Sequence, residues 1–304
     1  MKEDILITGG SGLLALNWAL TIREKFNVTL GLHDRKVNLK DTRSILFDLD
    51  SKEALAHSLE ALKPQLVIHT AGLTSIEQCE ANPTFAKYIN VDLTKNLAMI
   101  CAKLNIPIVY ISTDHLFSGS ESLVDEDFPV SPINVYAKTK AEAETCVLDA
   151  DTKALIIRTN FYGWGTSYRQ SFSDMVINHL RAGKKISLFK DIYFTPMLVE
   201  PFVNSVHELV HKKAKGIFNV VGDDRISKYD FGLRLAQEFN LDNALIDEGK
   251  IIDKPSLVNR PHDMSLSNEK VTNFLGVKMG GLDEHILKLK TQEVNGLAKE
   301  LQTL

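Results

Sequence analysis

The chain has 304 residues, of which 44% are hydrophobic and 24% are charged, and its formal net charge is −4. This composition excludes a mainly disordered chain, and the absence of a strongly basic stretch argues against a nucleic-acid partner. Apolar runs fall short of the roughly 18 residues that span a bilayer, so we expect a soluble, cytoplasmic protein that does not use a membrane.

In chain order, the first 158 residues alternate between short apolar runs and segments of helical periodicity. The predicted strands are 4–8, 28–32, 45–47, 66–70, 106–112 and 154–157. Four helices are predicted: 13–26, a second that ends near residue 62, 82–104 and 136–148. Asp50 and Glu53 form a capping box for the second helix, and Asn82 is the N-cap of the third. This alternation is typical of an α/β fold with a doubly wound parallel sheet.

Beyond residue 158 the alternation becomes irregular, which predicts a smaller, mixed C-terminal lobe folded over the edge of the sheet. Glycines and aromatic residues gather in 161–165. A helix over 201–213 and a strand over 217–221 are expected to return to the main sheet, and Ser227 with Asp230 forms a capping box for a later helix.

Cysteine and histidine spacing gives no sign of a metal site. Cys79, Cys101 and Cys146 lie 22 and 45 residues apart, without a CxxC pair, and the nine histidines show no ligand spacing. We therefore expect buried, unpaired thiols and no metal.

The segment from Thr8 to Ala15 (TGGSGLLA) places glycines between the first strand and the first helix. Glycines let the backbone approach a pyrophosphate, and the free N–H groups of a helix N-terminus favour an anion. In this position the motif predicts a dinucleotide site, with a ligand-free tight turn as the alternative. The expected cofactor-binding residues here are Gly9, Ser11, Gly12, Leu13 and Leu14.

The end of the second strand bears on the type of nicotinamide cofactor. Asp34 could hold the ribose hydroxyls of NAD(H), whereas Arg35 and Lys36 could hold a 2′-phosphate. Two cations against one acid favour NADP(H) over NAD(H), with a solvated charged turn as the alternative. Asp48 follows the third strand, where it contacts the adenine edge or simply begins a loop.

A candidate catalytic pair lies in the helix that begins near residue 136. Tyr136 and Lys140 are four residues apart and share one helix face, and Glu144 follows Lys140 at the same spacing, as in an ion pair. A nearby ammonium lowers the pKa of a phenol and enables proton transfer near neutrality. Thr113, at the end of the preceding strand, offers a hydroxyl that can hold a carbonyl.

The glycine turn, Thr113 and the Tyr136–Lys140 pair resemble the motifs of the extended short-chain dehydrogenase/reductases. Several segments resemble the dTDP-4-dehydrorhamnose reductase family in particular, over nearly the whole chain. These are Asp48-Leu49, Thr70–Thr74 (TAGLT), Asn90–Asp92 (NVD), Tyr110–Gly119 (YISTDHLFSG), Phe194–Pro196 (FTP) and Asn259–Pro261 (NRP).

The resemblance implies an oxidoreductase that uses NAD(P)H to reduce the 4-keto group of a deoxysugar nucleotide. Tyr136 would donate the proton, Lys140 would lower its pKa and hold the nicotinamide ribose, and Thr113 would orient the carbonyl. Further cofactor contacts are implied for Ala71, Gly72 and Thr74, and Arg35, Asp48 and Leu49 are also expected to bind the cofactor. Substrate contacts are implied for Asp114, His115, Phe161 and Arg260, although Phe161 could be core packing and Arg260 could brace a loop.

The same resemblance divides the chain into an NAD(P)-binding Rossmann domain, residues 1–160 and 195–222, and a substrate-binding lobe, residues 161–194 and 223–304. The sequence departs from the family pattern at two places. His115 stands where these reductases usually have Tyr, and the segment 158–163 is one residue shorter, with Phe161 in place of Trp.

Two alternative functions share these motifs. A nucleotide-sugar epimerase or dehydratase has the same triad, but dehydratases commonly have Asp-Glu after the Thr, whereas His115 follows Asp114 here. A non-catalytic, NADP-binding regulatory subunit is the second alternative, as in the β subunit of methionine adenosyltransferase, which resembles the same family. A small-molecule substrate and a homodimer are the expected partners.

Overall fold

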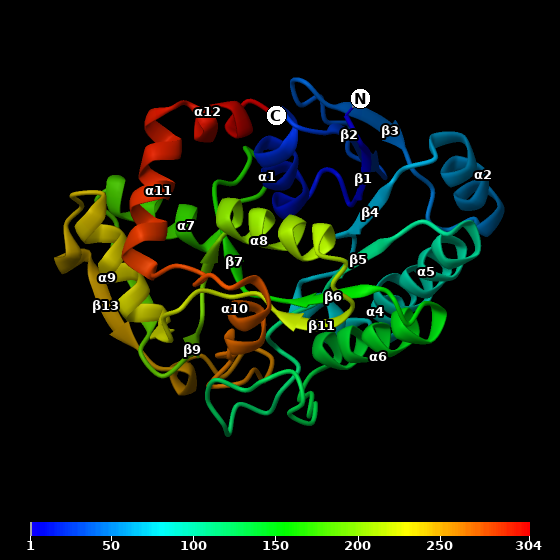
Figure 1. Cartoon of the computed structure of the whole chain (residues 1–304). Coiled ribbons are helices and arrows are strands. Elements are labelled where there is room, and N and C mark those ends of the chain that lie inside the picture. The colour runs from blue at the N-terminus through cyan, green and yellow to red at the C-terminus, as the bar shows by residue number, and fades with distance from the viewer. Residues whose placement is uncertain (1) are drawn as a thin grey trace.

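The computed structural model describes residues 2–304, which build a seven-stranded parallel sheet flanked by helices (Figure 1). The strand order is β11-β6-β5-β4-β1-β2-β3. The strands are β1 (Asp4–Thr8), β2 (Asn27–Leu32), β3 (Arg43–Leu46), β4 (Leu66–His69), β5 (Ile108–Ile111), β6 (Leu155–Arg158) and β11 (Gly216–Asn219). The order reverses between β1 and β4, where open α/β sheets hold their ligands.

Helices cover both faces of this sheet, so its strands are apolar on both sides. In β1, Ile5 and Ile7 pack into one core cluster with α1 and α8, whereas Leu6 packs into a second cluster with α2, α5 and α6. These helices are α1 (Leu13–Ile22), α2 (Lys52–Leu62), α5 (Leu93–Leu104), α6 (Val135–Ala150) and α8 (Val199–His211). The predicted doubly wound α/β fold is confirmed.

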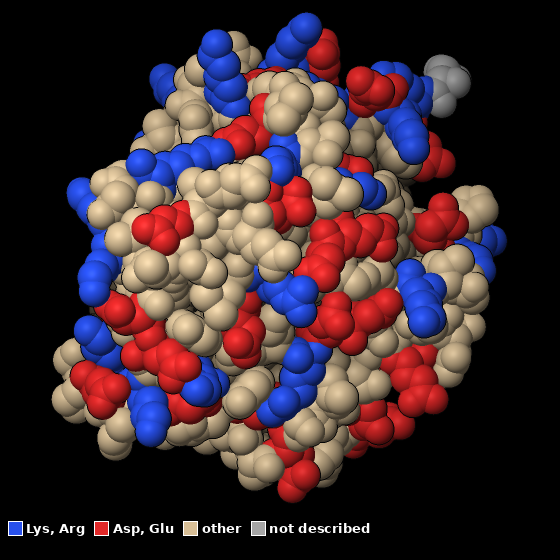
Figure 2. Space-filling model, turned by 90° about the vertical axis from the view of Figure 1, so that its left-hand side faces the viewer, with Lys and Arg blue, Asp and Glu red and all other residues tan. Residues whose placement is uncertain are grey.

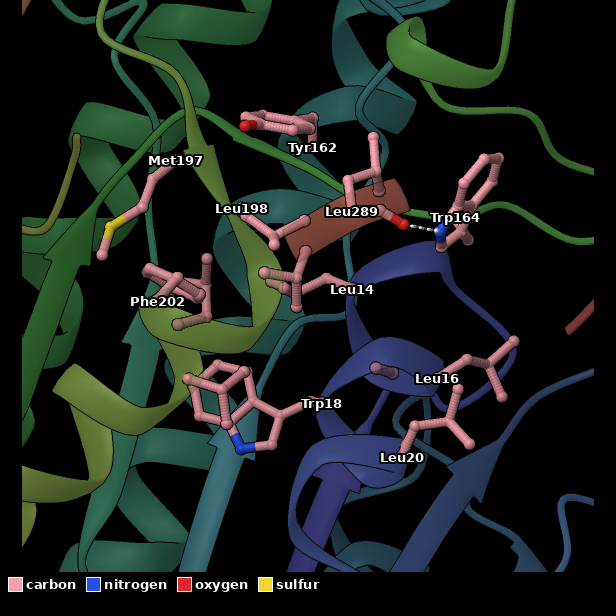
Figure 3. Close-up of a cluster of buried hydrophobic side chains, with 14 of the residues drawn as sticks. Leu14, Leu16, Trp18, Leu20, Tyr162, Trp164, Met197, Leu198, Phe202 and Leu289 are labelled. Atoms are coloured by element: carbon pink, nitrogen blue, oxygen red, sulfur yellow. Dashed lines mark hydrogen bonds between the residues drawn. The ribbon is translucent and has the colours of Figure 1, made fainter. Parts of the chain in front are cut away.

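The first core cluster joins the start of the chain to its second half (Figure 3). Trp18 of α1 is fully buried and packs edge-on against Phe202 of α8, with ring centroids 5.6 Å apart. Leu14 and Leu198 lie in the same cluster. Burying side chains of this size stabilises the packing by roughly 1.5–3 kcal/mol each, which fixes α1 against α8.

A second group of elements lies beside the carboxyl ends of the strands and contains three two-stranded sheets: β7–β10, β9–β12 and β8–β13. Its strands are β7 (Phe161–Tyr162), β8 (Ile186–Phe189), β9 (Tyr193–Phe194), β10 (Met197–Leu198), β12 (Ile226–Ser227) and β13 (Ile246–Gly249). Its α-helices are α7 (Phe172–Arg181), α9 (Lys228–Glu238), α10 (Glu269–Leu275), α11 (Leu282–Val294) and α12 (Leu297–Gln302), and 3₁₀ turns cover Asn243–Leu245 and Ile251–Asp253. The domain boundaries drawn from the sequence stay a prediction.

The structure corrects three details of the predicted elements. Ser51, one residue after Asp50, caps α2, because its hydroxyl accepts the N–H of Ala54 at 3.1 Å. A short helix, α3 (Ile76–Ala81), precedes Asn82 and was not expected. The helix predicted over 82–104 is divided by a π-helical segment, Tyr88–Asp92, between α4 (Pro83–Lys87) and α5.

The cysteines are free, and Cys79 and Cys101 are buried as expected, whereas Cys146 is half-buried. In residues 2–304 there is no helix with both the length and the apolar character that a membrane crossing requires. Basic and acidic side chains are interspersed over the side of the molecule that carries α9 and α11 (Figure 2).

Candidate functional site

The glycine turn between β1 and α1 is shaped by close backbone approach. Gly9 has a φ of +67°, and a Cβ there would lie 2.8 Å from the Cα of Ala71. A Cβ on Gly10 would lie 2.8 Å from the Cβ of Leu30. Gly12 is the N-cap of α1 and supplies no side chain to its first turn, which begins with Leu13 and Leu14 and contains no acidic residue. The first N–H groups of α1 are therefore left for an anion, as a dinucleotide diphosphate requires.

The charged segment after β2 lies beside this turn. Asp34 is exposed and pairs with His33 at 3.0 Å, whereas the Arg35 guanidinium lies 4.0 Å from the ring centroid of Tyr168. Asp48 is exposed, and its carboxylate accepts the backbone N–H of Asp50 at 2.8 Å, so here it forms the loop that precedes α2. Leu49 is half-buried and packs against the second core cluster.

The loop after β4 carries Ala71, Gly72 and Thr74, and Asn90 of the π-helical segment holds it in place. The Asn90 amide accepts the N–H of Leu73 at 2.7 Å, donates to its carbonyl at 3.0 Å and donates to Thr139 of α6 at 3.0 Å. Asn90 thus ties the loop to α6. π-Helical turns of this kind are frequent at functional sites, but a regular helical reading of the sequence gave no sign of this one.

Thr113 lies within hydrogen-bonding reach of Tyr136, and Thr113, Tyr136 and Lys140 are all buried, with 5%, 8% and 7% of their surface exposed. Thr113 follows β5 directly, and Tyr136 lies in the first turn of α6. Asn134 fixes the start of that helix, because its side chain accepts the N–H of Ala137 at 2.9 Å. Thr113 and Tyr136 therefore lie together at the carboxyl end of β5, and Lys140 reaches the last carbonyl of the same strand.

The electrostatics of this trio differ from the expectation in one respect. Burial raises the pKa of Tyr136 to about 12, and a hydrogen bond with Thr113 opposes that shift. The Lys140 ammonium donates to the carbonyl of Ile111 at 2.7 Å and lies 4.2 Å from the ring centroid of Tyr110. Burial lowers the pKa of Lys140 to about 7. The expected lowering of the Tyr136 pKa is absent here, because burial dominates and the Lys140 ammonium is not among the groups that shift it.

The ion pair expected between Lys140 and Glu144 is also not formed. Glu144 instead binds Arg158 at the end of β6, at 2.7 Å and 3.0 Å, and both side chains are buried. A guanidinium matches a carboxylate with two parallel hydrogen bonds, which an ammonium cannot provide.

On the substrate side, Asp114 is buried and accepts the amide N–H of Asn160 at 2.5 Å. The ring of His115 packs edge-on against Tyr136, with centroids 5.8 Å apart. Burial, the largest cause, lowers the pKa of His115, so its imidazole is neutral at pH 7. Its Nδ1 is buried and has no hydrogen-bond partner within residues 2–304. These polar groups adjoin the phenol of Tyr136.

The remaining two predicted substrate residues have partners in the protein. Arg260 forms an ion pair with Glu77 of α3 and donates to the carbonyl of Val258 at 3.3 Å. Phe161 stacks on Phe202, with ring centroids 6.4 Å apart, and packs against the first core cluster. These contacts are compatible with the core packing and loop bracing that the sequence left open, and the substrate roles of both residues stay predictions.

Two residues near the site were missed by sequence reasoning. Asn160 reaches Asp114 only because β6 and β5 are neighbours in the sheet. Lys228 begins α9, and its ammonium lies 3.3 Å from the ring centroid of Phe194. Burial lowers the pKa of Lys228 to about 8, and the charges of Asp114 and Arg260 are close enough to affect it. The Ser227 capping box placed Lys228 on a helix, but nothing in the sequence placed that helix at the site.

The arrangement combines a free helix N-terminus, a buried phenol beside a hydroxyl, and polar side chains at the carboxyl end of the sheet. It suits binding of a dinucleotide and proton exchange with a carbonyl oxygen. Among residues 2–304, His, Cys, Asp and Glu side chains form no group of three that could hold a metal ion.

Comparison with known proteins agrees with this arrangement. The profile of the RmlD substrate binding domain matches residues 1–292. The probable low-salt glycan biosynthesis reductase Agl14 of Haloferax volcanii is 28% identical over 288 residues, which cover 93% of this chain and 96% of that protein. Methionine adenosyltransferase 2 subunit beta of Mus musculus is 27% identical over 279 residues, covering 89% of this chain and 82% of that protein.

Among solved structures, the dTDP-4-dehydrorhamnose reductase of Bacillus anthracis, in complex with NADP, superimposes with a TM-score of 0.86 at 23% identity. The match covers 96% of this chain and 100% of that one and shows a common fold. The family is one of oxidoreductases of the short-chain dehydrogenase/reductase type, as expected from the motifs. Because the profile spans almost the whole sequence, the chain belongs to the RmlD substrate binding domain family.

Proposed function

We propose that this protein is an NADP(H)-dependent reductase of a 4-keto sugar nucleotide, close in chemistry to the dTDP-4-dehydrorhamnose reductases. The observation that carries the proposal is the buried trio of Thr113, Tyr136 and Lys140, which lies at the carboxyl end of the sheet that also holds the uncapped glycine turn. This combination would bind a dinucleotide at the glycine turn and a substrate carbonyl at the Tyr136 hydroxyl.

The glycine turn and the first turn of α1 hold the diphosphate of the dinucleotide, through Gly9, Ser11, Gly12, Leu13 and Leu14. Arg35 holds the 2′-phosphate that distinguishes NADP(H) from NAD(H), and the loop 71–74 lines the channel. When bound, the nicotinamide supplies the hydride.

Proton transfer is the task of Tyr136. Its pKa of about 12 keeps the phenol protonated at neutral pH, so it is a donor poised for an alkoxide, which is a stronger base. Thr113 orients the carbonyl by hydrogen bonding, and Lys140 stabilises the phenolate that remains and binds the nicotinamide ribose. The neutral imidazole of His115 and the Asp114–Asn160 pair face the sugar hydroxyls.

The diphosphate of the substrate requires cations on the lobe side of the crevice. Arg260 and Lys228 are the candidates, because the charges of Arg260 and Asp114 are close enough to act on the pKa of Lys228. Residues 161–194 and 223–304 form the substrate-binding lobe in this proposal, and residues 1–160 and 195–222 form the nucleotide-binding domain.

The decisive experiment compares two buried tyrosines. Tyr136→Phe removes one hydroxyl at the site, and Tyr162→Phe removes a buried hydroxyl of the core that has no hydrogen-bond partner among residues 2–304. With a panel of 4-keto sugar nucleotides, Tyr136→Phe should lose about 100-fold or more in NADPH oxidation, with NADPH binding nearly unchanged. Tyr162→Phe should retain turnover.

Full activity of Tyr136→Phe would refute the assigned mechanism. A regulatory role, as the name of the mouse relative suggests for that protein, would appear instead as absence of ketone reduction together with co-purification of a larger synthetase. An epimerase would retain its cofactor tightly through purification, so the cofactor content of the purified protein separates it from a reductase.

A further inference from the structure

Between β7 and α7 the chain forms a strap, residues 164–171, that crosses from the second group of elements to the glycine turn. A tight turn closes its tip: the N–H of Thr166 donates to the carbonyl of Arg169 at 2.9 Å, and the reverse bond is 3.3 Å. A Cβ on Gly165 would lie 2.3 Å from the carbonyl oxygen of Arg169. Glycine is therefore required for the strap to close on itself.

The strap is anchored at both ends. The Trp164 indole N–H donates to the carbonyl of Leu289 at 3.0 Å (Figure 3), and the Trp164 carbonyl accepts the amide of Asn17 at 2.7 Å. At the other end, Asp174 accepts the N–H groups of Gly165 at 2.6 Å and Ser171 at 2.9 Å. Because both ends are fixed, the tip is held in one place against the nucleotide-binding elements.

The tip contacts three separate segments of the cofactor site. The Tyr168 hydroxyl donates to the carbonyl of Ser11 at 2.8 Å, and the Tyr168 ring lies under the Arg35 guanidinium at 4.0 Å. The neighbouring Arg169 donates to the hydroxyl of Thr74 at 2.8 Å. Tyr168 is thus fixed between the glycine turn and the one guanidinium of the segment 33–36.

The stacking of Arg35 on Tyr168 has a consequence for anion binding. A planar guanidinium stacked on an aromatic ring keeps its N–H edge available for two hydrogen bonds to an oxyanion. Within residues 2–304, Arg35 pairs with no carboxylate at salt-bridge distance, although Asp34 is its neighbour in sequence. An exposed arginine without such a support loses side-chain entropy when it binds.

From this geometry we infer that Tyr168 is a positioning residue: it holds Arg35 for the 2′-phosphate of NADP(H) and so sets the preference over NAD(H). The inference rests on the proposed cofactor site and deepens it. The preference of the nucleotide-binding domain for NADP(H) is then set partly by Tyr168, a residue of the proposed substrate-binding lobe.

The test measures binding by calorimetry to the full-length protein, with NADP⁺, NAD⁺ and 2′,5′-ADP as probes, so that turnover is not needed. Tyr168→Ala should weaken binding of NADP⁺ and 2′,5′-ADP by about three- to tenfold and leave NAD⁺ nearly unchanged. Tyr168→Phe keeps the ring and loses only the hydrogen bond to Ser11, so it should retain most of the selectivity. Arg169→Ala is the matched control, because it loosens the same tip without touching Arg35 and should leave the NADP⁺/NAD⁺ ratio unchanged.

A double-mutant cycle between positions 35 and 168 keeps the inference testable if Tyr168→Ala is poorly folded. Arg35→Lys retains the charge but loses the planar fork, so in this background Tyr168→Phe and Tyr168→Leu should show the same selectivity. In the wild-type background, Tyr168→Leu should lose selectivity and Tyr168→Phe should not.

Three outcomes would overturn the inference. Equal weakening of NADP⁺ and NAD⁺ by Tyr168→Ala would assign the strap a general structural role. Tighter binding of 2′,5′-ADP would show that Tyr168 blocks the site. A wild-type protein that binds NAD⁺ as well as NADP⁺ would remove the selectivity to be explained while leaving the reductase intact, whereas binding of neither dinucleotide would instead contradict the proposed function.

Discussion

The proposed cofactor side and the proposed substrate side of the site are built in different ways. On the cofactor side, β1, the glycine turn and α1 are consecutive in the chain, and Gly12 bonds back to Gly9 at 2.7 Å. On the substrate side, the partners are distant in sequence: Asn160 and Asp114 are 46 residues apart, and Arg260 and Glu77 are 183 apart. Local geometry thus shapes the glycine turn of the proposed nucleotide site, whereas tertiary packing assembles the proposed substrate side.

The buried pair of Arg158 and Glu144 lies where the regular alternation of strands and helices ends, and it offers the largest expected effect. Arg158→Met leaves the Glu144 carboxylate buried and unpaired, so the free energy of unfolding should fall by about 3–5 kcal/mol, as measured by denaturant titration. The double variant Arg158→Met/Glu144→Leu should recover most of that loss. If the single variant is as stable as the wild type, the pair does not connect α6 to the sheet as described.

Two glycines with positive φ test whether the backbone of the proposed cofactor side is closely packed. Gly9→Ala combines a φ of +67° with a backbone contact at 2.8 Å, so it should cost about 2–4 kcal/mol of stability and abolish dinucleotide binding. Gly183→Ala has a similar φ, +64°, but no atom within 4 Å of the added Cβ, and should cost about 1 kcal/mol. Equal losses in thermal denaturation would contradict the role given to close packing at Gly9.

The buried ammonium of Lys140 should make the free energy of unfolding depend on pH. Its pKa is about 7 in the folded protein and near 10.4 in an unfolded chain, so the unfolded state binds more protons between these values. Lys140 therefore destabilises the fold most below pH 7, and this penalty fades as pH rises. Relative to the wild type, Lys140→Met should gain about 2 kcal/mol more at pH 7 than at pH 9. A difference independent of pH would mean that Lys140 keeps its ordinary pKa.

The smallest effect on stability is expected at Arg260, on the substrate side. Its ion pair with Glu77 is partly exposed, so Glu77→Gln and Arg260→Met should each change the free energy of unfolding by less than about 1 kcal/mol. Their effects on KM for a sugar nucleotide should differ, because Glu77→Gln frees the guanidinium and Arg260→Met removes it. KM should rise severalfold only in Arg260→Met, and an equal rise in both variants would assign the pair a purely structural role.

Much of the fold could be predicted, because strands buried on both faces are continuous apolar runs and leave a clear pattern. Element ends were less certain. The π-helical segment around Asn90 and the capping of α2 by Ser51 depend on single hydrogen bonds that a periodicity of apolar residues does not encode. The predicted ion pair of Glu144 with Lys140 was wrong for a similar reason. Lys140 is the neighbour of Glu144 in the helix, but Arg158 on the sheet binds the carboxylate more strongly.

By itself, the sequence determined the parallel sheet, the glycine turn and the placement of Tyr136 and Lys140 on one helix, because each depends on spacing within a single element or between consecutive ones. Only the tertiary structure decided that burial raises the pKa of Tyr136, that Lys140 faces Ile111, and that Tyr168 lies under Arg35. Those features depend on segments that are distant in sequence and that exclude water from a titratable side chain or contact it. Such desolvation and contacts exist only in the packed chain.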